Sequence, residues 1–296
     1  MKNLLKKIRY LLEALIVWLA LLFFRFLGPK NASNFAAFLA KTVGKRHSTN
    51  KLAFDNISKA LPNLNKARKL EIVEDMWDNL GRIVGEYVHI SRENPQNLLK
   101  KYVIIDEETL QNIDFIKNNK EKGGLIFSAH IGNWEIGPKI LANLGFDVST
   151  VYRPLNNPYV EKMTAQIRDT KLIAKSSKGS REIIAAIKNG QYVVILADQK
   201  TSEGELVKFF HDDAITTTSL ARIALKYDVP LIAARSIRIN KEFKFEIKIE
   251  KPLEFKKSDD LNKDILDLTR MINKKLEDWI REFPHQWFWV HNRWKK

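Results

Sequence analysis

The most informative part of the sequence for the fold is Gly123-Gly124-Leu125-Ile126-Phe127-Ser128-Ala129-His130-Ile131-Gly132-Asn133-Trp134-Glu135. Its apolar first half is typical of a buried strand, and residues 133–143 have the pattern of a helix. Open α/β sheets place their functional sites at the carboxyl ends of such strands. We therefore predict that His130 lies at a sheet edge and that Glu135, in the first helical turn, accepts from one imidazole nitrogen. Such a carboxylate fixes the tautomer and raises the basicity of the other nitrogen.

Strands and helices alternate through the rest of this half of the chain. We predict strands over residues 125–129, 147–152, 192–197, 231–238 and 243–249. We predict helices over residues 133–143, 158–168, 180–188, 216–226 and 261–283. Because the last two strands flank Asn240-Lys241, they are expected to form an antiparallel hairpin. The fold class is therefore α/β, with a mixed central sheet flanked by helices.

The half of the chain that precedes this region has a helical pattern. Apolar residues recur at three- and four-residue spacings over 31–61 and again over 67–88. We therefore divide the chain into a hydrophobic anchoring helix, 1–30, and one domain, 31–296. In that domain, 31–121 is mostly helical and 122–296 is the α/β catalytic part.

The N-terminus combines basic residues with an apolar run. Lys6, Lys7 and Arg9 precede uninterrupted apolar residues over 14–24, and Gly28-Pro29 ends the segment. The run is shorter than the roughly 20 residues that span a bilayer, although 8–27 reaches that length with three charged residues. A single span and a monotopic membrane helix are both open, and a buried helix of a soluble protein is the alternative. A cleaved signal peptide fits less well, because no small-x-small site follows the run closely.

The composition favours an anionic partner without naming it. Lys and Arg number 50 against 35 Asp and Glu, which gives a net charge of +15 over 296 residues. Such a charge suits phosphorylated lipid, an anionic membrane face, an acidic carrier protein or nucleic acid. Cysteine is absent, which excludes disulfides, thiolate catalysis and cysteine metal sites.

Polar residues also follow two other predicted strands. Arg153 comes after the strand over 147–152, and Asp198-Gln199 after the strand over 192–197. Their convergence with His130 at one sheet edge would make a cleft. Each has a simpler explanation: His130 as a structural histidine, Arg153 as a surface charge or cap, and Asp198 as the cap of a turn.

Four motifs occur in order along the chain and carry a family resemblance. They are Ser128-Ala129-His130 through Asn133-Trp134-Glu135, Tyr152-Arg153-Pro154 with Asn157-Pro158, Ala197-Asp198-Gln199, and Gln286-Trp287-Phe288-Trp289-Val290-His291-Asn292-Arg293-Trp294-Lys295. Together they resemble the lipid A late acyltransferases, the lauroyl and myristoyl transferases of Gram-negative envelopes. The resemblance covers nearly the whole chain. His285 and Asn292 depart from the family pattern, which usually has glutamate and arginine there.

The resemblance implies a fold like that of the glycerolipid acyltransferases and an O-acyl transfer at the cytoplasmic face of the inner membrane. The donor would be an acyl thioester on acyl carrier protein. The acceptor would be the hydroxyl of a 3-hydroxyacyl chain on a phosphorylated, Kdo-bearing lipid A precursor. This chemistry needs no enzyme nucleophile, cofactor or metal ion.

The resemblance also assigns roles to residues. His130 would remove the hydroxyl proton, and Glu135 would stabilise the imidazolium that forms. Arg153 and Arg168 would hold substrate phosphate or the developing oxyanion, and Asn133 would donate to the same region. Asp198 and Gln199 would order the pocket.

Other functions and roles stay open from the sequence. One is an acyltransferase for a glycerophospholipid or another glycolipid, and a second is a basic protein that binds nucleic acid or membrane without catalysis. The C-terminal tryptophans are core residues, an acyl-pocket wall or an interfacial belt. The spacing of His285 and His291 does not match a helical zinc motif, so no metal site is expected.

Overall fold

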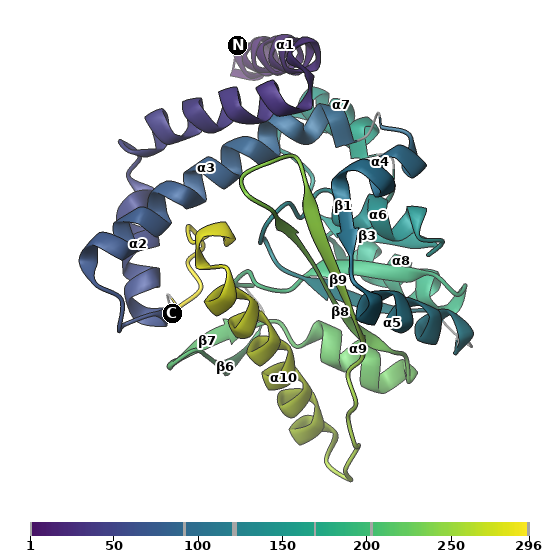
Figure 1. Cartoon of the computed structure of the whole chain (residues 1–296). Coiled ribbons are helices and arrows are strands. Elements are labelled where there is room, and N and C mark those ends of the chain that lie inside the picture. The colour runs from purple at the N-terminus through teal and green to yellow at the C-terminus, as the bar shows by residue number, and fades with distance from the viewer. Residues whose placement is uncertain (1, 91–92, 120–122, 169, 202–203, 295–296) are drawn as a thin grey trace.

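A seven-stranded sheet forms the centre of the molecule in a computed structural model that describes residues 2–90, 93–119, 123–168, 170–201 and 204–294 (Figure 1). Residues 121 and 122, at the expected boundary between the two halves, and Lys295 of the C-terminal motif lie outside these residues. The strand order is β1-β9-β8-β2-β5-β3-β4. Neighbours are parallel except β8 and β9, which are antiparallel. The predicted mixed sheet is therefore confirmed. The strands are β1 (Val103–Ile105), β2 (Gly124–Ser128), β3 (Val148–Tyr152), β4 (Lys171–Ala174), β5 (Tyr192–Leu196), β8 (Leu231–Arg238) and β9 (Phe245–Pro252).

The helices surround this sheet. A separate antiparallel hairpin consists of β6 (Glu205–Phe209) and β7 (Asp212–Thr216), and it was not predicted from the sequence. The helices are α1 (Lys2–Gly44), α2 (Thr49–Ala60), α3 (Lys66–Ile90), α4 (Pro95–Tyr102), α5 (Glu107–Asn118), α6 (Gly137–Asn143), α7 (Pro158–Arg168), α8 (Ser177–Lys188), α9 (Ser219–Tyr227) and α10 (Leu261–Glu282). A short 3₁₀ helix, η1 (Pro284–Gln286), follows α10.

Two helices begin later than predicted. The helix expected from residue 133 begins at Gly137, because Asn133 to Ile136 form a turn, and Glu135 therefore lies before α6 rather than in its first turn. The helix expected from residue 216 begins at Ser219, because Thr216 still pairs in β7.

Strand β2 is covered on both faces, as its apolar sequence requires. Leu125 and Phe127 point into one core cluster, and Ile126 points into another on the opposite face. The C-terminal tryptophans Trp287 and Trp289 are fully buried, so these two are core residues.

Between β8 and β9 the chain reverses at Asn240 and Lys241, whose φ angles are +50° and +56°. Positive φ at both central residues is the geometry of the tight hairpin turn. The hairpin predicted at this dipeptide is therefore confirmed.

Helix α1 consists of two helical segments that meet at a kink at Gly28-Pro29, where the sequence predicts the end of the hydrophobic segment, because Gly28 has a non-helical backbone with φ +71° and ψ +164°. Among the described residues, α1 is the helix that is long and apolar enough to cross a membrane, judged by length and composition. Eleven large apolar side chains on its first half are exposed, whereas Phe24 is buried, and so much exposed apolar surface is not the pattern of a soluble core helix. They are Leu4, Leu5, Ile8, Leu11, Leu12, Leu15, Ile16, Trp18, Leu19, Phe23 and Phe26. The second part of the helix packs along α3 (Figure 1).

The loop after β2 depends on Gly132. Its φ is +57°, and a Cβ atom placed there would lie 1.8 Å from the backbone oxygen of Ser236 in β8. Both the conformation and the close approach of the two backbones require glycine.

We expect Gly132→Ala to lower the free energy of unfolding by at least about 2 kcal/mol, because the clash is with rigid backbone. Gly137→Ala is the matched control, since a Cβ atom there meets nothing within 4 Å. Urea unfolding of the two variants in the same detergent measures the difference. Equal stability of Gly132→Ala and the wild type would contradict the assignment.

Candidate active site

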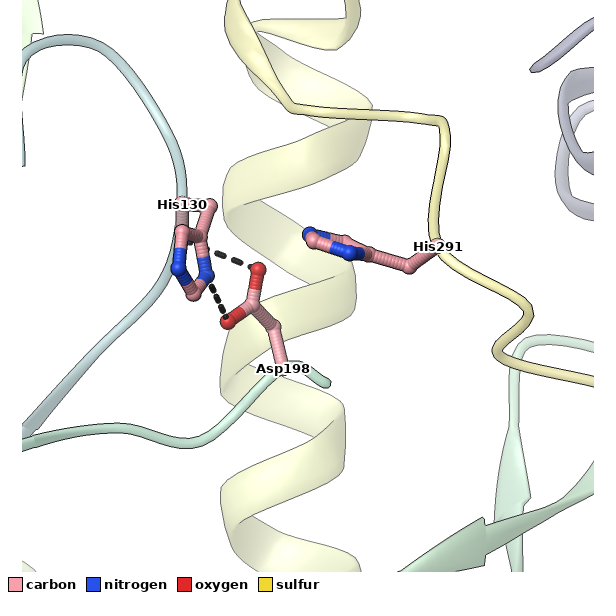
Figure 2. A group of neighbouring side chains, drawn as sticks. All are labelled: His130, Asp198 and His291. Atoms are coloured by element: carbon pink, nitrogen blue, oxygen red, sulfur yellow. Dashed lines mark hydrogen bonds and ion pairs between the residues drawn. The ribbon is translucent and has the colours of Figure 1, made fainter. Parts of the chain in front are cut away.

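Strands β2 and β5 deliver His130 and Asp198 to the same point. The two strands are parallel, and Ser128 pairs with Leu196 at their carboxyl ends. His130 and Asp198 each lie two residues beyond this pair, so their side chains meet. His130 Nδ1 lies 2.8 Å from Asp198 Oδ1, and a dashed line in Figure 2 marks this contact. The predicted convergence of polar groups at this sheet edge thus brings these two together.

Asp198 is fully buried, and its carboxylate is held by three hydrogen bonds. Oδ1 accepts from His130 Nδ1, and Oδ2 accepts from the backbone N–H of His130 at 2.9 Å and from Trp287 Nε1 at 2.8 Å. Burial by itself opposes ionisation, but the neighbouring His130 and its hydrogen bonds hold the pKa of Asp198 well below its usual range. Asp198 is therefore a fixed anion behind the imidazole.

This arrangement determines which nitrogen of His130 is basic. Because Asp198 accepts only, Nδ1 carries the proton and Nε2 keeps its lone pair. The side chain of Gln199 lies on that lone pair, with its Nε2 at 3.2 Å from His130 Nε2. Gln199 is exposed, so a substrate hydroxyl can take its place.

An open pocket of about 500 Å³ lies beside Gln199 and His291, two neighbours of the His130 ring. Its lining consists of Gln199, Lys200, Thr201, Val290, His291 and Asn292. Gln199 therefore lies between His130 Nε2 and this open space.

Glu135 has a different partner from the one predicted. Both of its carboxylate oxygens accept from Arg168, at 3.0 and 3.1 Å. Arg168 ends α7 and lies over the rings of Tyr152 and Tyr87, with its guanidinium carbon 5.5 and 5.9 Å from their centroids. Asp198 occupies the place beside His130 Nδ1 that was predicted for Glu135, although it lies 68 residues from His130 in the sequence. The physical reason is the turn at residues 133–136, which directs Glu135 toward α7.

Asn133 is fully buried and serves the loop itself. Its side chain donates to Glu86 of α3 at 2.8 Å and accepts from the backbone N–H of Glu135 at 3.2 Å. Glu86 is paired in turn with Arg238 of β8, whose NH2 lies 2.8 Å from Oε2. This geometry leaves the amide of Asn133 engaged with protein, in contrast to the expected donation to substrate.

Arg153 lies at the end of β3, as predicted, and its side chain is exposed. Within the part of the chain that the structure describes, it makes no hydrogen bond or ion pair. The structure thus groups His130 with Asp198 and Gln199, groups Glu135 with Arg168, and leaves Arg153 apart.

His291 is a residue of this site that sequence reasoning considered only as a metal ligand and set aside. Its ring centroid is 5.1 Å from that of His130, and its Nε2 is buried without a hydrogen-bond partner in the described part of the chain. Burial, only partly opposed by Asp198, lowers the pKa of His291 to about 4, so its imidazole is neutral at pH 7. Its membership of the C-terminal motif was the only signal in the sequence.

Among the described residues, His130, Asp198 and His291 could hold a metal ion, since one ligand atom from each lies within 4.8 Å of the others. These residues are far apart in sequence, so ligand spacing did not reveal the cluster. The expectation that no metal is required for the reaction stays a prediction.

A family model and a curated relative carry the same family description. The family model described as bacterial lipid A biosynthesis acyltransferase matches residues 1–296. The chain is similar to the lipid A biosynthesis acyltransferase of Haemophilus influenzae, with 21% identity over 243 residues, covering 79% of this chain and 72% of the relative. Among solved structures, it is similar to the 1-acyl-sn-glycerophosphate acyltransferase of Thermotoga maritima, with a TM-score of 0.37, 14% identity, and coverage of 97% of this chain and 100% of that one. The match of the family model to the whole chain shows that this protein belongs to the bacterial lipid A biosynthesis acyltransferases.

Proposed function

We propose that this protein transfers a fatty acyl group from the thioester of acyl carrier protein to the hydroxyl of a 3-hydroxyacyl chain on a Kdo-bearing lipid A precursor. One observation carries the proposal: the lone pair of His130 Nε2 faces Gln199, an exposed residue that lines the open pocket, while a buried carboxylate holds Nδ1. That is the arrangement of a general base for a hydroxyl group.

In the proposed reaction, His130 Nε2 takes the proton of the acceptor hydroxyl as its oxygen attacks the thioester carbonyl carbon. The C–S bond then breaks, and the imidazolium returns the proton to the thiolate. Asp198 stabilises the imidazolium between these two transfers. General base assistance supplies roughly 10²–10⁴-fold, so positioning and stabilisation of the oxyanion supply the rest.

Charge and the exposed helix support a lipid substrate at a membrane. The net charge of +15 favours a phosphorylated acceptor and an acidic carrier protein. Arg153, exposed at the end of β3, is the proposed phosphate ligand, and Arg168 is proposed to face the acceptor from the end of α7. The apolar first half of α1 is proposed to anchor the protein at the cytoplasmic face of the inner membrane of a Gram-negative cell. We propose that Glu135 is required because it holds Arg168.

The assay that tests this function follows a labelled acyl group from acyl carrier protein. Transfer to a lipid A precursor, and not to lysophosphatidate, is the expected result. Transfer to lysophosphatidate alone would favour a glycerophospholipid acceptor. Salt-sensitive binding of nucleic acid without any transfer would favour the non-catalytic alternative. Mass spectrometry of lipid A from cells that lack and then regain the protein gives the same answer in the cell.

His130→Ala is expected to lower kcat by roughly 10²–10⁴-fold, because the base is lost. The same acyl transfer assay measures it, with the unfolding midpoint and membrane partition of the variant as controls for folding. Activity equal to that of the wild type would refute the assignment of His130 as base.

Asp198→Asn is expected to lower kcat by about 10³–10⁴-fold, because a neutral amide neither fixes the tautomer nor stabilises the imidazolium. Its KM for the acceptor is expected to change little, since Asp198 is buried away from substrate. An Asp198→Asn enzyme with wild-type kcat would show that another group orients His130.

Glu135→Gln and Arg168→Gln are expected to lower activity to a similar extent, because each breaks the same bidentate ion pair. The double variant is then no worse than the worse single one, since neighbouring residues that act as a unit are not additive. Multiplicative losses in a double-mutant cycle would mean that Glu135 acts independently of Arg168.

A further inference from the structure

Two imidazoles and one carboxylate converge at the site, and the proposed reaction uses only His130 and Asp198. The third group, His291, reaches them from the C-terminal segment. Figure 2 shows its ring pointing toward Asp198, on the side of the carboxylate away from the His130 ring. One ligand atom from each of the three lies within 4.8 Å of the other two.

The Nε2 atom of His291 is buried and has no hydrogen-bond partner among the residues that the structure describes. Buried polar atoms nearly always have a partner, and each exception asks for an explanation. Because no protein hydrogen bond has to be broken, this nitrogen is available to a ligand. It lies near the imidazole of His130 and the carboxylate of Asp198, which can also bind a metal ion, so a metal cation is the ligand that all three groups could bind together.

The carboxylate of Asp198 also has room for such a ligand on one side. Oδ2 accepts two hydrogen bonds, from His130 N and Trp287 Nε1, whereas Oδ1 accepts one, from His130 Nδ1. A carboxylate oxygen has two lone-pair sites, so Oδ1 keeps one.

Two imidazole nitrogens and one carboxylate oxygen form a ligand set that Zn²⁺ takes, with the fourth position open. Zn²⁺ binds such atoms at about 2.0–2.2 Å in a tetrahedron, which separates the ligand atoms from one another by about 3.3 Å. That value lies between the 2.8 Å of the His130–Asp198 hydrogen bond and the 4.8 Å limit of the cluster. Closing the site therefore shortens any separation of the ligand atoms by no more than about 1.5 Å, and it replaces the hydrogen bond from His130 Nδ1 to Asp198 by bonds to the metal.

We propose that His130 Nδ1, the carboxylate of Asp198 and His291 Nε2 form an inhibitory site for Zn²⁺ and similar divalent transition metals. The neutral imidazole of His130 carries one proton. When the metal takes the lone pair of Nδ1, that proton moves through solvent to Nε2, with no net change in protons or electrons. Nε2 is then an N–H group and no longer a base, so the metal stops proton abstraction without blocking the pocket. The binding site does not depend on the proposed function, whereas the inhibition rests on it.

The experiment uses the full-length protein in detergent, free of affinity tags and chelators, with Zn²⁺ and Co²⁺ as probes. Calorimetry with Zn²⁺ and the visible absorption of Co²⁺ measure binding directly. We expect one metal ion per chain, and we expect Mg²⁺ not to compete, because it prefers six oxygen ligands. Acyl transfer is expected to fall with added Zn²⁺, to be unaffected by Mg²⁺, and to return with EDTA.

His291→Phe keeps an aromatic ring but removes the ligand, and we expect it to weaken Zn²⁺ binding at least about 100-fold, beyond the usual cost of an outer-shell change. Its remaining acyl transfer is expected to need at least about tenfold more Zn²⁺ for the same inhibition. The matched control is His285→Phe, since His285 is a half-buried histidine of the same segment that lies outside the cluster. It is expected to bind Zn²⁺ as the wild type does.

His291→Gln provides a second test if His291→Phe does not fold, as judged by its unfolding midpoint. Absence of metal binding by the wild type, or wild-type binding by either folded His291 variant, would overturn the site. A rise in activity on His291-dependent binding would overturn the inhibitory role. If the wild type binds Zn²⁺ through His291 but transfers no acyl group, the metal site stands and the proposed function fails.

Discussion

The hydrogen bonds to the buried carboxylate of Asp198 join the ends of β2 and β5 to the C-terminal segment. A buried charge is stable only when it is paired and hydrogen-bonded, and Asp198 meets that condition with donors from two other segments. His130 reaches it from the end of β2, and Trp287 reaches it from the segment after α10. The register of β2 and β5, the packing of the C-terminus and the tautomer of His130 are thus fixed together. Loss of any one donor leaves the others facing an under-satisfied anion.

A second buried network holds the loop that carries the base. Glu86, in the middle of α3, accepts from Ser33, Asn133 and Arg238, and it has no exposed surface. Asn79 of the same helix donates to the backbone oxygen of Gly132 at 2.8 Å. The helical half of the chain is therefore more than a support for membrane attachment. It positions the backbone from which His130 projects, and it links that backbone to α1 through Ser33.

Much of this fold follows from local sequence, and the site follows only in part. Strands β2, β5 and β8 could be predicted because each is a short apolar run, and the β8–β9 hairpin could be predicted from Asn240-Lys241. The β6–β7 hairpin could not, because each of its strands has only five residues, two of them charged, and neither is a continuous apolar run. His130 was predicted correctly at a strand end. Glu135 was predicted as its partner because only residues near His130 in the sequence could be recognised as its neighbours. Asp198 is 68 residues away, and its position beside His130 comes from strand pairing that no local pattern encodes.

The central claim is that Asp198, and not Glu135, holds the Nδ1–H of His130. NMR of protein labelled with ¹⁵N in its histidine rings measures this directly, with the His130 signals assigned by their loss in His130→Gln. We expect a neutral His130 protonated at Nδ1, with a downfield Nδ1–H signal that Asp198→Asn removes or shifts strongly and Glu135→Gln leaves in place. A His130 protonated at Nε2, or a signal that responds to Glu135→Gln and not to Asp198→Asn, would contradict it.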